Sequence, residues 1–198
     1  YPPFFDSQCL YGRDGRDHAD NDRRFAFFSR GVLEGLKRAG FKPDVIHVHD
    51  WQTGLIPFYL KSLMAGDPFF TGTASVMTLH NMAYQGNFSP SCLGDMGAGP
   101  KDFTPESLEY YGKVSFLKAG IIHADLLTTV SPTYAREIQA SAERGFGMEG
   151  LLRQRSGSLF GVLNGIDLDI WNPEKDQHLP RRYGAADRAA GKAACKAA

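Results

Sequence analysis

Short β-branched runs alternate with longer amphipathic segments along this chain, and this alternation constrains the fold more than any other feature. VIHVH (45–49), SVMTLH (75–80) and DLLTTVS (125–131) each have the length and composition of a buried strand. Strands that alternate with helices predict a parallel sheet with right-handed crossovers and helices on both faces. We therefore expect an α/β fold with a doubly wound, Rossmann-like parallel sheet.

Helical patterns begin before the first strand and continue after it. Apolar residues in 23–39 recur at three- and four-residue spacing, and Gly40 stands where a helix stop is expected. Segment 51–66 continues as an amphipathic helix whose middle Pro57 should perturb. The unit predicted here is a strand, then Asp50, then a helix.

The same order repeats farther along the chain. The remaining predicted elements are a helix over 106–124, with Tyr110 and Tyr111 as packing residues, a helix over 132–139 capped by Ser131, a short helix over 148–155, a last strand over 158–167 and a helical tail over 191–198. The chain begins without Met, in a turn-rich segment, and its tail has no C-terminal cap. These two features predict an internal piece of a longer chain.

Composition excludes several classes of function. Lys+Arg and Asp+Glu both number 22, so a formal net charge of zero offers no long-range field to gather nucleic acid or an anionic membrane. No stretch approaches the roughly 20 apolar residues of a membrane-spanning helix. The three cysteines are far apart and odd in number, which favours a reducing, cytoplasmic setting. Oligomeric state is left open.

Candidate functional residues follow from the predicted sheet. In a doubly wound sheet the ligand crevice lies outside the carboxyl ends of the strands. The polar residues at these positions are Asp50, His80 with Asn81, Ser131 and Asn164. Ser131 is interpreted as a helix cap, so the other four are the candidates for a site.

Four blocks carry a family resemblance over nearly the whole chain: PDVIHVHDWQTGLIPFYLK (43–61), TLHNMAYQGNF (78–88), SFLKAGIIHADLLTTVSPTYAREI (115–138) and GFGMEGLLRQRSGSLFGVLNGIDLDIWNP (145–173). Together they resemble the bacterial-type glycogen and starch synthases. The resemblance implies a GT-B-type glycosyltransferase, with two Rossmann-like domains facing each other across a cleft. Such an enzyme transfers glucose, with retention, from ADP-glucose to the non-reducing end of an α-1,4-glucan, and uses no cofactor.

The resemblance also implies a domain division. Residues 1–163 correspond to part of the acceptor-side domain, and 164–198 to the interdomain crossing and the start of the donor-side domain. The family's Lys-Thr-Gly-Gly loop would precede Tyr1, and its donor-side Arg/Lys pair would follow Ala198. The chain alone is therefore expected to be nearly inactive, and a non-catalytic glucan-binding or regulatory half-module is the alternative.

Asp50 and His80 are the catalytic residues that the resemblance implies. Asp50 would orient the acceptor or support the charged sugar, and His80 would lie near the donor glucose. From the residues alone, Asp50 could instead cap the helix that follows it, and a histidine at a strand end is more often structural.

Four more residues are expected to bind substrate. The resemblance places Asn81 beside the glucan and Asn164 at the ligand cleft, and Asn164-Gly165 also favours a tight turn. Tyr84 and Gln85 would line the acceptor groove, where an aromatic ring can stack on a sugar, although Tyr84 could equally belong to the core.

Two other patterns suggest different chemistry. His47 and His49 form an HxH pair without an accompanying ligand set, so we expect no metal. GFGMEG (145–150) matches GxGxxG, but a charged helical segment rather than a strand precedes it, so we interpret it as a loop before a helix. A nicotinamide oxidoreductase would rest on this motif alone, and sucrose- or trehalose-type GT-B enzymes would lack TLHNMAYQGNF as written.

Overall fold

The computed structural model describes residues 2–6 and 9–198. It divides into two compact units, Tyr1–Leu163 and Asn164–Ala198. No helix in the described ranges is long and apolar enough to cross a membrane.

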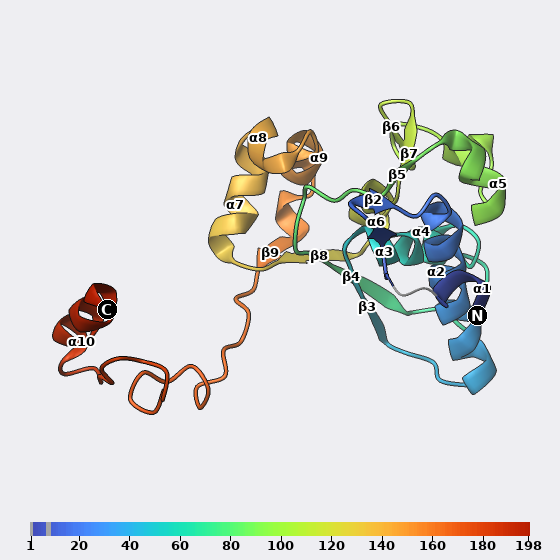
Figure 1. Ribbon diagram of the computed structural model, residues 1–198. Coiled ribbons are helices and arrows are strands. Elements are labelled where there is room, and N and C mark those ends of the chain that lie inside the picture. The colour runs from blue at the N-terminus through green and yellow to red at the C-terminus, as the bar shows by residue number, and fades with distance from the viewer. Residues whose placement is uncertain (1, 7–8) are drawn as a thin grey trace. The chain divides into compact units, whose positions relative to one another are not determined.

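A four-stranded parallel sheet lies at the centre of the first unit (Figure 1). Its strands lie side by side in chain order: β3 (Val45–His49), β4 (Ala74–Leu79), β8 (Leu126–Thr129) and β9 (Leu159–Gly161). His49 pairs in register with Thr78, and Thr78 with Thr128, so the carboxyl ends of three strands meet at one edge. This confirms the α/β class and the Rossmann-like parallel sheet.

The two faces of this sheet differ in burial. On β3, Ile46 and Val48 are buried, whereas Val45, His47 and His49 alternate with them and are exposed. The strands follow one another in a single direction, so right-handed crossovers place the connecting helices on the same face. The helices described below pack against the face that carries Ile46 and Val48.

The first helices pack together over the covered face. α2 (Asn21–Ala39) packs against α3 (Asp50–Thr53) and α4 (Leu55–Lys61), and these two pack against α6 (Phe116–His123). α2 ends at Gly40, which is left-handed at φ 65°, as predicted. The helix predicted over 51–66 ends at Lys61 and is divided at Gly54, while Pro57 lies buried inside α4. A Cβ at Gly54 would lie 2.1 Å from the carbonyl oxygen of Phe116, so glycine permits this close approach.

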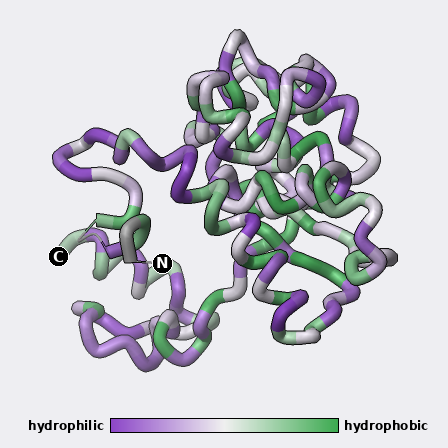
Figure 2. Tube along the Cα trace, turned by 90° about the vertical axis from the view of Figure 1, so that its right-hand side faces the viewer, coloured by the Kyte–Doolittle hydropathy of each residue, from purple (hydrophilic) through white to green (hydrophobic). Residues whose placement is uncertain are grey.

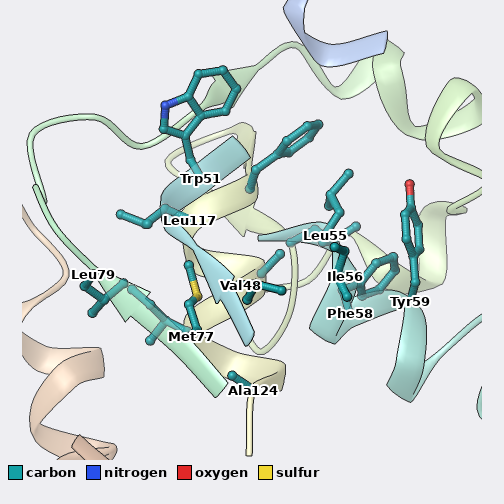
Figure 3. Close-up of a cluster of buried hydrophobic side chains, with 14 of the residues drawn as sticks. Val48, Trp51, Leu55, Ile56, Phe58, Tyr59, Met77, Leu79, Leu117 and Ala124 are labelled. Carbon is teal, nitrogen blue, oxygen red and sulfur yellow. The ribbon is translucent and has the colours of Figure 1, made fainter. Parts of the chain in front are cut away.

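Apolar side chains between the sheet and these helices form the core (Figure 3). Figure 2 shows hydrophobic residues concentrated in the interior of the first unit. Contacts here leave little free space, since a Cβ at Gly120 on α6 would lie 2.3 Å from the sulfur of Met77. The central members of the cluster are Val48, Leu55, Phe58, Met77, Leu79, Phe116, Leu117 and Leu127.

The segment predicted as one helix over 106–124 begins instead with a β-hairpin. β6 (Glu109–Tyr110) pairs antiparallel with β7 (Lys113–Ser115), and β5 (Asn87–Phe88) pairs with the other side of β7. Tyr110 and Tyr111 therefore lie on a hairpin and not in a helix. α6 begins at Phe116, where the Ser115 hydroxyl accepts a hydrogen bond from the Lys118 N–H.

The amino ends of two strands are joined by Asp125. One carboxylate oxygen accepts hydrogen bonds from the Ser75 N–H (2.7 Å) and the Ser75 hydroxyl (3.0 Å), and the other accepts from Lys61 (2.7 Å). Partial burial raises the pKa of this carboxyl, but the bonds from Lys61 and Ser75 outweigh burial and the pKa lies below its ordinary value. Asp125 thus stabilises the start of β4 against the start of β8.

Predicted helices after β8 are confirmed, and the last strand is shorter than predicted. The Ser131 hydroxyl caps α7 (Pro132–Ala140) by accepting from the Tyr134 N–H at 2.9 Å. β9 ends at Gly161, and residues 162–167 have no regular structure. The other elements are α1 (Pro2–Phe5), β1 (Gly12–Arg13), β2 (Arg16–Asp17), η1 (Pro90–Cys92), α5 (Leu93–Met96), η2 (Pro100–Asp102), α8 (Ala142–Gly145), α9 (Glu149–Gln154) and η3 (Ser156–Ser158).

The second unit contains the helical tail, α10 (Arg188–Ala197), as predicted. The tight turn predicted at Asn164-Gly165 is wrong, because these residues form no turn. A turn follows slightly later, where the Asp167 carboxylate accepts from the N–H groups of Asp169 and Ile170. Asp167 therefore caps this turn.

Candidate functional site

Asp50 links the carboxyl ends of two neighbouring strands. It follows β3 directly, and one of its carboxylate oxygens accepts a hydrogen bond of 2.7 Å from the backbone N–H of His80, which follows β4. Its φ of 51° is in the left-handed region, which is uncommon for a residue other than glycine. No side-chain bond caps α3, so among the described residues the carboxylate connects two strand ends rather than capping the helix.

Histidine rings gather beside this link. His49 Nδ1 and His80 Nε2 lie 3.0 Å apart, so one of these two nitrogens carries the proton that joins the rings. The His47 ring centroid lies 4.4 Å from that of His49. Partial burial lowers the pKa of His49, and His47 and His80 lower it further, against the opposing effect of Asp50. His49 is therefore held towards its neutral form.

A hollow of about 560 Å³ opens at this edge of the sheet. Four of the six predicted site residues line it, namely Asp50, Asn81, Tyr84 and Gln85. His80 is next to Asp50 but is not among the lining residues. Tyr84 is 66% exposed, which rejects the alternative that it belongs to the core.

Further lining residues were not predicted from the sequence. Trp51 and Gln52 follow Asp50 in the chain, and Tyr11 and Asp17 come from the β1–β2 region. The position of Trp51 and Gln52 directly after the strand-end aspartate could have indicated them. No local pattern indicates Tyr11 or Asp17, because they reach the hollow from a distant part of the chain.

The loop that carries Tyr84 and Gln85 is anchored at both ends. The Asn81 side-chain oxygen accepts from the Ala83 N–H at 3.0 Å, and the Gln85 carbonyl accepts from the Leu117 N–H at 3.1 Å. The Gln85 side chain also donates to the Phe146 carbonyl at 3.0 Å. The loop is thus connected to α6 and to the GFGMEG segment.

GFGMEG lies between helices, as predicted. Gly145 ends α8, and Glu149 begins α9. This placement lacks the strand-to-helix turn that brings N–H groups to a pyrophosphate in dinucleotide-binding proteins. Within residues 2–6 and 9–198, no three His, Cys, Asp or Glu side chains are grouped so that they could hold a metal ion.

Asn164 is the first residue of the second unit. Its expected role at a ligand cleft stays a prediction, as do the roles expected for the five residues of the first unit.

Comparisons with known proteins agree with one another. Residues 1–154 match the family model described as "Starch synthase catalytic domain". The glycogen synthase of Elusimicrobium minutum is 50% identical over 193 residues, which is 98% of this chain and 40% of that protein. Glycogen synthase 2 of Geobacter sulfurreducens is 52% identical with the same coverage.

A solved structure is also similar. It is the catalytic domain of starch synthase IV from Arabidopsis thaliana, bound to ADP and acarbose, with a TM-score of 0.77 and 38% identity. The alignment covers 97% of this chain and 38% of that one. The present chain thus spans about two fifths of the length of the curated relatives it matches. Because the family model covers more than half of its residues, the chain belongs to the starch synthase catalytic domain family.

Proposed function

We propose that this chain supplies the acceptor side of a retaining enzyme that transfers glucose from ADP-glucose to the non-reducing end of an α-1,4-glucan. The observation that carries the proposal is the 560 Å³ hollow at the carboxyl ends of β3 and β4, where Asp50, Asn81, Tyr84 and Gln85 meet. Family membership supports the reaction class, and the similarity to a starch synthase domain bound to ADP and acarbose supports both ligands.

Glucosyl transfer requires stabilisation of opposite charges. Positive charge develops on the sugar as the bond to the diphosphate breaks, and negative charge develops on the leaving group. Asp50 supplies the negative charge on this side of the reaction. Its hydrogen bond from the His80 N–H fixes the carboxylate. In this proposal the His80 ring acts near the donor glucose.

The loop after β4, which carries Asn81, Tyr84 and Gln85, binds the acceptor glucan in this proposal. The exposed ring of Tyr84 can stack on a pyranose face. The amide groups of Asn81 and Gln85 can exchange hydrogen bonds with sugar hydroxyls. A hollow of this size is typical of small-ligand sites and leaves room for part of a glucan chain.

The second unit completes the proposal. We assign 164–198 to the interdomain crossing and the start of the donor-side domain, with Asn164 facing the ligand cleft. The 198 residues alone then bind glucan but transfer little glucose, because the groups that hold the diphosphate belong to the donor side. We place the enzyme in the cytoplasm on the spacing and odd number of its cysteines.

A chimeric enzyme that contains this chain tests the proposed glucosyl transfer. The 198 residues would replace the matching segment of the Elusimicrobium minutum glycogen synthase, and transfer of radiolabelled glucose from ADP-glucose to maltoheptaose would be measured. Asp50→Asn and His80→Ala should each lower turnover at least tenfold, about 1.4 kcal/mol of transition-state stabilisation. Phe41→Ala, an exposed aromatic away from the hollow, is the matched control. Turnover at the unsubstituted level in both site variants would refute the assignment.

Glucan binding without transfer is the second candidate, since the hollow lies wholly within the first unit. It would be favoured if the isolated chain binds maltoheptaose and the exchanged protein shows no transfer.

A further inference from the structure

A second hollow, of about 440 Å³, lies between the β6–β7 hairpin and α9 with the residues just before it. Its walls include Glu109, Tyr110 and Tyr111 on the hairpin side and Met148, Leu151 and Gln154 on the other. None of the residues predicted for the site contributes to it. Figure 1 shows this hairpin, labelled β6 and β7, apart from the central sheet.

The hairpin presents one aromatic ring at a cost in backbone strain. Its two-residue turn is Tyr111-Gly112, and both residues have positive φ, 49° and 76°. Such turns favour Asn-Gly, whereas a bulky residue at positive φ is unfavourable. Tyr111 is nevertheless 82% exposed, so burial of its ring does not offset the backbone strain. Strain of this kind concentrates at ligand sites.

Tyr110 makes the wall of the hollow rigid. Its ring meets that of Tyr111 edge to face, with centroids 4.7 Å apart and an interplanar angle of 76°. Its hydroxyl donates to the Phe146 carbonyl at 3.0 Å. Burial, with a smaller effect of Tyr111, raises the pKa of Tyr110 and keeps the phenol protonated for this bond. A Cβ at Gly147 would lie 2.4 Å from the Tyr110 oxygen, so only glycine leaves this arrangement intact.

The groups around the hollow suit a neutral ligand. The cation that lines the hollow, Lys118, is 8% exposed and donates to the carbonyls of Pro105 and Glu109, so its ammonium group is already bonded within the protein. Gln154 offers an amide and Glu109 a carboxylate, both able to bond hydroxyl groups. An aromatic platform beside such groups fits a pyranose better than a phosphate.

One carbonyl connects this hollow to the first. The Phe146 oxygen accepts from the Tyr110 hydroxyl and also from the Gln85 side chain, which lines the hollow at Asp50. The walls of the two hollows are therefore joined at the Phe146 carbonyl.

We propose that the hollow beside Tyr110 and Tyr111 is a saccharide-binding subsite that takes further glucose units of an α-glucan, with the Tyr111 ring stacked on a pyranose face. The identity of the saccharide rests on the proposed function. The subsite itself rests on the hairpin and its surroundings.

Tyrosine fluorine resonances test the subsite directly. The chain would be labelled with 3-fluorotyrosine and titrated with maltoheptaose, and the signals of Tyr111 and Tyr84 would be assigned with Tyr111→Phe and Tyr84→Phe. Both signals should shift with saturation. A shift at Tyr84 without one at Tyr111 would overturn the subsite and leave the proposed function standing. A shift at Tyr111 alone would support the subsite and contradict the acceptor hollow, and no shift at either would contradict both.

Affinity measured by calorimetry gives a second readout. Tyr111→Asn removes the ring yet suits the turn, so it should raise the thermal unfolding midpoint while weakening maltoheptaose binding about tenfold. Tyr111→Phe keeps the ring and should bind within about twofold of the unsubstituted chain. Phe41→Ala is the control for loss of an exposed aromatic. Unchanged affinity in Tyr111→Asn would overturn the proposal even if the variant is more stable.

Discussion

Two carboxylates lie at opposite ends of the same sheet, and their surroundings differ. At the amino end, Asp125 accepts three hydrogen bonds, from Ser75 and Lys61, through both of its oxygens. At the carboxyl end, Asp50 stands at a left-handed φ, and within residues 2–6 and 9–198 only the His80 N–H donates to its carboxylate. Both carboxylate oxygens of Asp125 therefore accept hydrogen bonds within the fold, whereas the Asp50 carboxylate can still accept hydrogen bonds from a ligand.

The comparison shows why residue type alone does not indicate role. Both aspartates flank a strand of the same parallel sheet. Ligands bind outside the carboxyl ends of such strands, and Asp50 lies at that end whereas Asp125 lies at the other. Stability and function should therefore separate when the two aspartates are substituted.

The largest expected effect is at the amino end. Asp125→Ala leaves the Ser75 N–H, the Ser75 hydroxyl and Lys61 without their acceptor and should lower the free energy of unfolding by about 2 kcal/mol. Urea denaturation measures this loss, and maltoheptaose affinity should stay unchanged. Lys61→Met, which removes one exposed partner, should cost less than about 1 kcal/mol. If Asp125→Ala weakened glucan binding in the folded protein, the proposed separation of the two ends would fail.

At the carboxyl end, the backbone should matter more than the charge for stability. Asn tolerates a left-handed φ and can still accept from the His80 N–H, so Asp50→Asn should change the free energy of unfolding by less than about 0.5 kcal/mol. Asp50→Ala has neither property and should cost about 1 kcal/mol. The same denaturation measurement compares them. Equal losses in both variants would show that the strain at Asp50 has no energetic weight.

Low pH should lower the stability of the protein through Asp125, at the amino end of the sheet. The folded-state pKa of Asp125 is below the ordinary value of 3.8, so its stabilising contribution is present above that value and is lost as pH falls through the folded pKa. Unfolding measured between about pH 5 and pH 2 should show a shallower acid loss in Asp125→Asn than in the unsubstituted protein. If stability fell with pH equally steeply in Asp125→Asn and in the unsubstituted protein, other carboxylates would account for the loss of stability in acid.

His49 should give the smallest effect, near neutral pH. Its folded-state pKa is below the ordinary value of 6.5, so the unfolded chain binds the proton more readily. Stability should therefore fall slightly as pH drops from above 6.5 towards the folded pKa, and level off below it. His49→Gln should remove this slope, as thermal unfolding at a series of pH values would show. A slope that persists in the variant would assign it to another histidine.

Local sequence patterns determined most of the secondary structure. The β-branched runs became β3, β4 and β8, and the apolar spacing before Gly40 became α2. Ser131 caps α7 as its position predicts. These features depend on residues within a few positions of one another, which is the range over which hydrophobic periodicity and caps act. The strand ends, and hence Asp50 and His80 as candidates, followed from the same patterns.

Where contacts between distant segments compete with local propensity, the sequence was misleading. Segment 109–115 contains residues compatible with a helix, but pairing of β7 with β5 and the turn at Gly112 make it a hairpin. A helix here would be stabilised by local hydrogen bonds alone. The hairpin is stabilised by pairing with β5, which lies more than twenty residues earlier in the chain. Propensity is a weak prior when tertiary pairing is available.

By itself, then, the sequence determined the α/β class, the order of the main elements and the family, because each depends on local patterns or on extended motifs. Tertiary structure alone decided that the Asp50 carboxylate meets the His80 N–H and that His49 meets His80, contacts that join residues about thirty positions apart. It also decided that Gln85 and Tyr110 share the Phe146 carbonyl. Such contacts follow from the register and packing of whole strands and helices, and no short stretch of sequence encodes them.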